Sequence, residues 1–437
     1  MKPSNSLFIG EEEGIQDASG QVLNCIVNMS RVFRGDNPRD ALAPIPVKEF
    51  RNDAVDLIRR FPYTRFTKGV FALHIHELPP PPGALFFCLC ELFLTHPFTP
   101  VNSSDFSTVP SENAFIDGID TLLKQGLAVS VTVNSSEESR VRKDQYLLSP
   151  KACGAVFHGK EDLIRQVTVT QFGSIIAWKE IREKALFFPA ALQEQLVLIS
   201  RIVSRDGFPK ARKGLADRGL RSGITVLLSG PPGTGKTEFV RQLARHEGRD
   251  IFQVDAARMD GTYYGEKPRN LRDLFLLMRY MSAIMESVPI TFIDEADALF
   301  GRRVELQRAA DKEENLTANT ILEELNTFEG ILFAATNNVN LLDPAMDRRF
   351  LLKAFFPVPD APVLAGIWRS KLPFLTQEEA LALAKRYSLS GALIENVVSM
   401  CVLQESVDGK KPTLDLVFRY CEALANGVGK QRQRIGF

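Results

Sequence analysis

The sequence is poor in several features, and each absence excludes a class of protein. Its six cysteines are scattered and form no C-x-x-C pair. Neither a disulfide framework nor a cysteine-based zinc site is therefore expected, and a reduced, cytoplasmic protein is the simple interpretation. Lysine plus arginine balance aspartate plus glutamate at 53 each, which leaves no overall attraction toward nucleic acid or an anionic membrane. Residues 1–14 lack a basic stretch followed by an apolar one, so no signal peptide is expected.

Long hydrophobic runs are also missing. The most apolar segment, residues 84–94, is too short to span a bilayer and contains Glu91, so we expect a core helix there and no membrane span. His74 and His76 would face the same side of a strand, as a metal site would allow. No pattern of further ligands is evident around them, and an ordinary half-buried strand is the favoured interpretation.

The most informative motif present is Gly-Pro-Pro-Gly-Thr-Gly-Lys-Thr at residues 230–237, directly after the apolar run 224–228. It fits the P-loop pattern G-x-x-x-x-G-K-[ST] in its usual context of strand, glycine-rich turn and helix. Main-chain N–H groups converge there on phosphate oxygens, Lys236 adds a charge for the β- and γ-phosphates, and the Thr237 hydroxyl is placed to bind Mg²⁺. The residues expected to bind the nucleotide are Gly230, Pro231, Pro232, Gly233, Thr234, Gly235, Lys236, Thr237 and Glu238.

A second motif follows about fifty residues later, as expected for a nucleotide-hydrolysing site. The apolar run 288–293 ends in Asp294 and Glu295, which indicates a buried parallel strand with two carboxylates at its C-terminal edge. We expect Asp294 to hold Mg²⁺ through water and Glu295 to orient or deprotonate the attacking water. A solvent-facing acidic turn is the alternative.

Strands and helices alternate around these motifs, which predicts an α/β domain with a parallel sheet sandwiched by helices. The expected strands are 224–228, 251–254, 290–293 and 331–335; the expected helices are 238–246, 270–285 and 316–327. From Asp360 the pattern is helical only, which indicates a separate lid. We predict an N-terminal region at 1–82, a winged-helix-like domain at 83–160, a connector at 161–222 with a helix over 189–203, a large ATPase domain at 223–357 and a helical lid at 358–437.

The winged-helix prediction rests on shape. Helices at 84–94 and 111–124, strands at 127–133 and 145–148, and a last helix from Ser149 give an α+β pattern with a two-stranded wing. Many winged helices bind DNA, but residues 83–160 hold six cations against eight acids, a net charge of −2. DNA readers need a surplus of cations to neutralise phosphates, so this region favours contact with protein over contact with nucleic acid.

Together these stretches resemble the AAA family of ring-forming ATPases, within the AAA+ superfamily, over residues 200–435. The resemblance rests on the P-loop at 230–237, on Ile-Asp-Glu-Ala-Asp-Ala at 293–298, and on Ala-Thr-Asn-Asn at 335–338 followed by 342–350. The core is most similar to stand-alone bacterial AAA ATPases that have a winged-helix-like N-terminal region. The resemblance implies ATP and Mg²⁺ as ligands and an AAA+ fold with a C-terminal helical lid.

The resemblance also implies roles for three residues that follow the expected strand 331–335. Asn337 resembles the sensor that binds the γ-phosphate or the attacking water. Arg348 and Arg349 resemble arginine fingers that enter the nucleotide site of a neighbouring subunit, which would require a homo-oligomer, expected to be a hexamer. The short loop here leaves open whether one or both act. Ser-Gly-Ala at 390–392 resembles the start of a lid helix over the nucleotide, without a sensor-two arginine.

Tyr263 and Tyr264, within Gly-Thr-Tyr-Tyr-Gly-Glu at 261–266, resemble the pore loop that grips an extended polypeptide in this family. A tyrosine pair packed in the core is the alternative. The favoured function is an ATP-driven motor that remodels or disassembles a protein partner recruited by residues 1–160. The alternatives are a nucleic-acid-associated ATPase and a nucleotide-gated scaffold that threads nothing.

Overall fold

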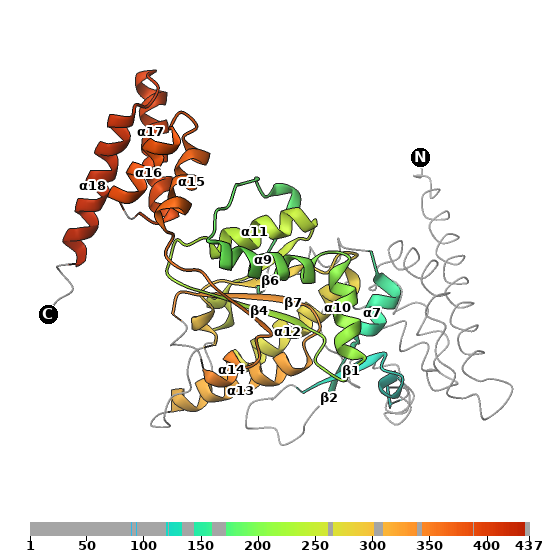
Figure 1. Ribbon diagram of the computed structural model, residues 1–437. Coiled ribbons are helices and arrows are strands. Elements are labelled where there is room, and N and C mark those ends of the chain that lie inside the picture. Colours follow the sequence, from blue (N-terminus) through green and yellow to red (C-terminus); the bar gives the residue numbers. More distant parts are fainter. Residues whose placement is uncertain are drawn as a thin grey trace, which may run out of the picture. The chain divides into compact units, whose positions relative to one another are not determined.

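The computed structural model describes residues 89, 93, 119–120, 122–132, 144–159, 172–260, 265–300, 309–338, 343–387 and 389–432 (Figure 1). They belong to two compact units: one comprises positions up to Val167 together with Ala283–Glu286, and the other comprises Thr168–Ser282 and Ser287 onward. Each unit is described separately below.

In the first unit, two short strands pair as predicted. β1 (Ala128–Thr132) and β2 (Asp144–Leu148) form an antiparallel ribbon, and α7 (Pro150–Phe157) follows directly. Ser149 caps α7, because its hydroxyl accepts a hydrogen bond from the N–H of Ala152 at 3.0 Å. Most of residues 83–143 and all of residues 1–82, with His74 and His76, lie outside the described residues, so the winged-helix domain stays a prediction.

The second unit is built on a six-stranded sheet of order β3-β5-β6-β7-β4-β8. Neighbouring strands from β5 to β8 pair in parallel, and β3 pairs antiparallel to β5. The central strands are β4 (Ile224–Ser229), β5 (Ile251–Val254), β6 (Ile290–Ile293) and β7 (Ile331–Thr336). All residues of β4, β6 and β7 are buried, which explains why these strands are predominantly apolar.

Two edge strands were not predicted from the sequence. β3 (Gly173–Ile176) lies within the predicted connector, and β8 (Leu352–Phe355) comes before the lid. Each has only four residues and is partly exposed, and β8 includes Lys353. Short, half-polar strands at a sheet edge give a weak sequence signal, since only one neighbour and one face hold them.

Helices flank this sheet, as predicted (Figure 1). Those of the ATPase part are α9 (Ala190–Val203), α10 (Gly207–Ala216), α11 (Lys236–Glu247), α12 (Glu266–Ile284), α13 (Ala309–Thr327) and α14 (Pro344–Asp347). The described residues also include 3₁₀ turns at Trp178–Glu180, before α9, and at Ala256–Met259 and Ala296–Ala298. α12 begins four residues before the predicted start, because Pro268 is tolerated in a first helical turn.

The lid consists of four helices (orange to red in Figure 1): α15 (Ala361–Lys371), α16 (Gln377–Arg386), α17 (Gly391–Asp408) and α18 (Leu414–Arg432). They enclose a core of their own around Trp368, Leu383, Ile394 and Cys401. α18 ends at Arg432, and basic side chains favour such a helix end. Among the described residues, none of the helices combines the length and apolarity that a membrane span needs.

Candidate nucleotide site

The P-loop connects β4 to α11 and depends on its glycines. Gly230, Gly233 and Gly235 have backbone φ values of +138°, +75° and +99°, which residues other than glycine rarely adopt. A Cβ on Gly230 would lie 2.1 Å from the carbonyl oxygen of Phe356, and one on Gly233 would lie 2.9 Å from Ser390 Oγ. The loop therefore has the tight, concave backbone that a phosphate group requires.

Lys236 stands at the start of α11 with only 6% of its surface exposed. Its Nζ donates to the carbonyl oxygens of Gly230 (2.6 Å) and Pro231 (2.8 Å) and to Asn337 Oδ1 (2.9 Å). Burial lowers the pKa of Lys236, and the nearby Asp294 charge opposes this. A buried ammonium held mainly by neutral oxygens would gain from an anionic ligand.

Thr237 and Asp294 are joined directly. Thr237 Oγ1 donates to Asp294 Oδ2 at 2.8 Å, which links the first turn of α11 to the end of β6. Hydroxyl and carboxylate oxygens are the ligands that Mg²⁺ takes in nucleotide sites, so this pair fits a magnesium ion beside a phosphate.

Glu295 is exposed, and its backbone is in the left-handed region, with φ 50° and ψ 47°. It is the single non-glycine residue with positive φ among those that the structure describes. Such a conformation costs about 1–3 kcal/mol and is concentrated at functional sites. Its N–H donates to Asp294 Oδ1 at 3.0 Å, which ties the backbone after β6 to the Asp294 carboxylate.

Asn337 follows β7, the strand between β6 and β4 in the sheet. This strand order brings its side chain to Lys236 of the P-loop; its role as a sensor stays a prediction. The same edge is braced by Thr336 Oγ1, which donates to Asp297 Oδ1 at 2.9 Å.

Arg348 and Arg349 lie at the end of α14 in different surroundings. Arg348 is exposed, whereas Arg349 is half-buried, and its Nε has no hydrogen-bond partner among the described residues. The carbonyl of Arg349 accepts from Thr225 Oγ1 at 2.8 Å. Neither guanidinium takes part in the Lys236–Asn337 or Thr237–Asp294 contacts.

The lid meets the P-loop where α17 begins. Ser390 caps this helix, and its Oγ is the atom nearest to a Cβ built on Gly233. The Ser-Gly-Ala stretch at 390–392 therefore begins a lid helix beside the P-loop, and its place over a nucleotide stays a prediction. Tyr263 and Tyr264 lie outside the described residues. Gly265, which follows them, has φ +84°. An ion pair of 2.7 Å joins Asp260, before the tyrosines, to Lys267, after them.

Sequence reasoning missed a set of aromatic side chains beside the loop. Phe188 lies 3.4 Å from a Cβ built on Gly235, and its ring is 5.4 Å from that of Phe356 and 6.4 Å from that of Phe239. The Phe187-Phe188 pair before the predicted helix was the available signal, since adjacent aromatics in a polar connector seldom stay in solvent.

Comparison with known proteins agrees with this geometry. Residues 226–358 match the family model described as "ATPase family associated with various cellular activities (AAA)". The chain is 29% identical over 265 residues to a proteasome-activating nucleotidase of Methanopyrus kandleri, covering 59% of this chain and 52% of that relative. It is 36% identical over 195 residues to the ATP-dependent zinc metalloprotease FtsH 3 of Sphaerobacter thermophilus, covering 42% and 38% respectively. A 26S proteasome regulatory subunit 6B homolog of Encephalitozoon cuniculi is 37% identical over 145 residues, covering 31% and 35%. The chain thus spans about half or less of the length of these relatives.

Proposed function

The chain contains an ATPase domain of the AAA family, and on this premise we propose that it binds ATP with Mg²⁺ at the P-loop and hydrolyses it. The observation that supports this most strongly is the meeting of two contacts at one sheet edge, Lys236 with Asn337 and Thr237 with Asp294. They place a cation, a neutral sensor and a pair of metal-binding oxygens around one loop.

Each residue then has a chemical task. The P-loop N–H groups and Lys236 bind the phosphates. Thr237 and Asp294 would hold Mg²⁺, which would supply neutralising positive charge beside the phosphates. Glu295 orients and deprotonates the attacking water, and Asn337 positions that water against the γ-phosphate. Phosphoryl transfer spreads negative charge over the γ-oxygens, which an arginine from a neighbouring copy would stabilise.

We propose further that the active form is a ring, expected to be a hexamer, that pulls on a protein partner. Two of the relatives are named as a proteasome-activating nucleotidase and a proteasome regulatory subunit, names that point to work on proteins. Tyr263 and Tyr264 would grip the polypeptide, and residues 1–160 would recruit it. A cytoplasmic location is part of this proposal. The sequence contains no H-E-x-x-H motif of the zinc metalloproteases, so the proposed motor carries no protease site of that kind.

The test measures phosphate release by the purified full chain alone, with a permanently unfolded protein, and with single- or double-stranded DNA. Stimulation by the unfolded protein, lost in Tyr263→Ala while basal hydrolysis remains, is the expected result. Stimulation by DNA alone would instead support the nucleic-acid-associated ATPase. Hydrolysis indifferent to both would support the scaffold, and no hydrolysis with intact ATP binding would refute the motor.

A further inference from the structure

Residues 181–188, here called the strap, cross the outer face of α11 before α9 begins. Arg245 donates to the carbonyl of Ile181 at 2.7 Å, and Gln242 Nε2 donates to the carbonyl of Arg182 at 2.9 Å. The N–H of Lys184 donates to Gln242 Oε1 at 3.1 Å. Positions 242 and 245 share one helix face, so the strap is held to the helix that begins with the P-loop lysine.

The Lys184 side chain extends this attachment to the lid. Its Nζ lies 3.1 Å from Glu238 in the first turn of α11 and 3.3 Å from Glu395 on α17. Glu395 also pairs with Lys371 on α15 at 2.6 Å. Four charges of alternating sign therefore run from the residue after Thr237, through the strap, to two lid helices.

Two of the four groups, Lys184 and Glu395, have pKa shifts that favour their charged forms. The hydrogen bond from Lys371, with the charges of Lys371 and Lys184, lowers the pKa of Glu395. Burial alone would lower the pKa of Lys184, but Glu238 and Glu395 together raise it.

Two aromatic side chains of the strap also connect the P-loop to the lid. A Cβ on Gly366 of α15 would lie 2.7 Å from Phe187 Cδ1, so the Phe187 ring rests against the lid where no side chain intervenes. Phe188 points instead to Gly235 and the core. Neighbouring strap residues thus contact the lid and the P-loop at the same time.

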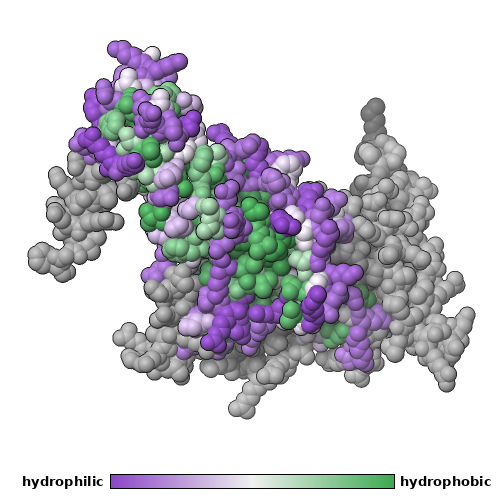
Figure 2. All heavy atoms as spheres, viewed as in Figure 1, coloured by the Kyte–Doolittle hydropathy of each residue, from purple (hydrophilic) through white to green (hydrophobic). Residues whose placement is uncertain are grey.

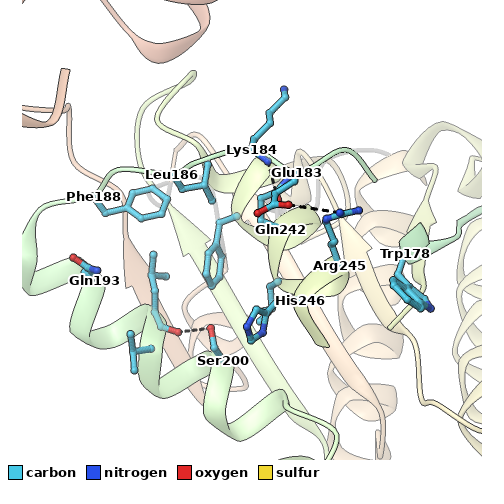
Figure 3. A pocket seen from close by; sticks show the side chains of 14 residues that line it. Trp178, Glu183, Lys184, Leu186, Phe188, Gln193, Ser200, Gln242, Arg245 and His246 are labelled. Carbon is cyan, nitrogen blue, oxygen red and sulfur yellow. Dashed lines mark hydrogen bonds and ion pairs between the residues drawn. The ribbon is translucent and has the colours of Figure 1, made fainter. Parts of the chain in front are cut away.

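The strap has open space behind it. A hollow of about 590 Å³ lies between the strap, α9 and α11. Figure 3 shows Leu186 and Phe188 of the strap along one side, Gln193 and Ser200 of α9 along another, and Gln242 and His246 on α11. Figure 2 shows apolar side chains gathered over α9, and Val197, which lines the hollow, is 52% exposed. Interiors are close-packed, so a segment beside such a hollow can shift at low steric cost.

We propose that the strap couples the P-loop to the lid, with Lys184 as the positioning residue that favours lid closure when nucleotide is bound. The inference rests on the proposed ATP site. Exposed ion pairs of this kind shift an equilibrium by about fivefold or less. A shift of that size would favour the closed lid and still allow the lid to open again in each cycle of ATP hydrolysis. Lys184→Gln and Glu395→Gln should each weaken closure without abolishing nucleotide binding.

Hydrogen–deuterium exchange on the full chain, with and without a non-hydrolysable ATP analogue, tests this. In the wild type the analogue should slow exchange in residues 230–240 and in lid residues 361–371 and 391–400. In Lys184→Gln and Glu395→Gln the lid protection should fall by about two- to fivefold while protection of 230–240 remains. Lys184→Arg keeps the charge and should retain lid protection, as should Lys210→Gln, an exposed lysine on α10.

The outcomes of this experiment separate the proposed strap coupling from the proposed ATP site. Unchanged lid protection in both glutamine variants, with the P-loop protected, would refute the strap coupling alone. An equal loss in Lys210→Gln would refute it too, because the effect would not depend on the network. No protection of residues 230–240 in the wild type would refute the ATP site and the inference with it.

Discussion

The hydroxyl of Thr237 donates to the carboxylate of Asp294 across 2.8 Å, and this contact joins two motifs 57 residues apart in the sequence. It forms because β4, which leads into the P-loop, and β6, which ends in Asp294, are both adjacent to β7 in the sheet. Their carboxyl ends therefore open on the same edge.

Replacing the Thr237 hydroxyl should impair metal use. Thr237→Val keeps the shape of the side chain but removes the oxygen, so turnover should fall at least about tenfold and the Mg²⁺ concentration for half-maximal activity should rise. Thr237→Ser keeps the hydroxyl and should stay near the wild type. A magnesium titration of ATP hydrolysis checks this, and an unaltered titration curve for the valine variant would remove Thr237 from the metal site.

Glu295→Gln should separate binding from chemistry. An amide cannot act as a base, so turnover should fall by about 10²–10⁴-fold while ATP binding is preserved. Single-turnover kinetics and equilibrium binding of a fluorescent ATP analogue measure the two quantities. Glu329→Gln, which alters an exposed carboxylate paired with Arg212, is the control. Normal turnover in Glu295→Gln would assign the base to another residue.

Lys236→Met should lose nucleotide without losing the fold. Without ligand, burial lowers the pKa of Lys236, so keeping the ammonium charged costs stability below that lowered pKa. The cost disappears as pH rises past the usual lysine value. The variant should therefore melt no lower than the wild type at neutral pH, and its relative advantage should shrink under alkaline conditions. ATP should raise the Tm of the wild type only; an equal rise in the variant would contradict the phosphate assignment.

Gly230→Ala and Gly214→Ala should shift stability in opposite directions. Gly230 has φ +138° and no room for a Cβ beside Phe356, so alanine should destabilise the fold by about 1–3 kcal/mol or distort the loop. Gly214 lies in α10, and a Cβ there would meet nothing nearer than 3.7 Å. Alanine at that site should stabilise the protein by about 0.5–1 kcal/mol. Urea unfolding of both variants measures this, and a neutral Gly230→Ala would contradict the close approach.

The central strands of the sheet could be predicted from the sequence, because parallel strands that are buried on both faces consist mainly of apolar residues. β5 and β6 match their predicted bounds, and β4 and β7 each extend by one residue. The stripe Leu192, Leu196, Ile199 and Val203 likewise forms the buried face of α9. Such patterns reflect local burial, which periodicity records directly.

What could not be predicted depends on tertiary contacts. The strap has no periodicity of its own, since side chains of α11 hold it through its backbone carbonyls. The left-handed backbone of Glu295 lies between the end of β6 and the turn Ala296–Ala298, and a glutamate at this position does not predict it. The neighbouring Arg348 and Arg349 are equivalent in sequence, yet the fold leaves Arg348 exposed and makes Arg349 half-buried.

That difference gives the last prediction, which concerns the arginines. Exposed Arg348 is free to reach a neighbouring copy, so Arg348→Ala should cut turnover by about 10³–10⁵-fold with unchanged nucleotide affinity and Tm. Arg349→Ala should lower Tm as well, because its side chain is half-buried and truncation removes that packing. Mixing Arg348→Ala with Lys236→Met should restore activity, since about a quarter of the interfaces in a randomly mixed ring pair an intact P-loop with an intact arginine. A finger acting within its own subunit would restore none, and full activity in a strictly monomeric Arg348→Ala protein would rule out the finger altogether.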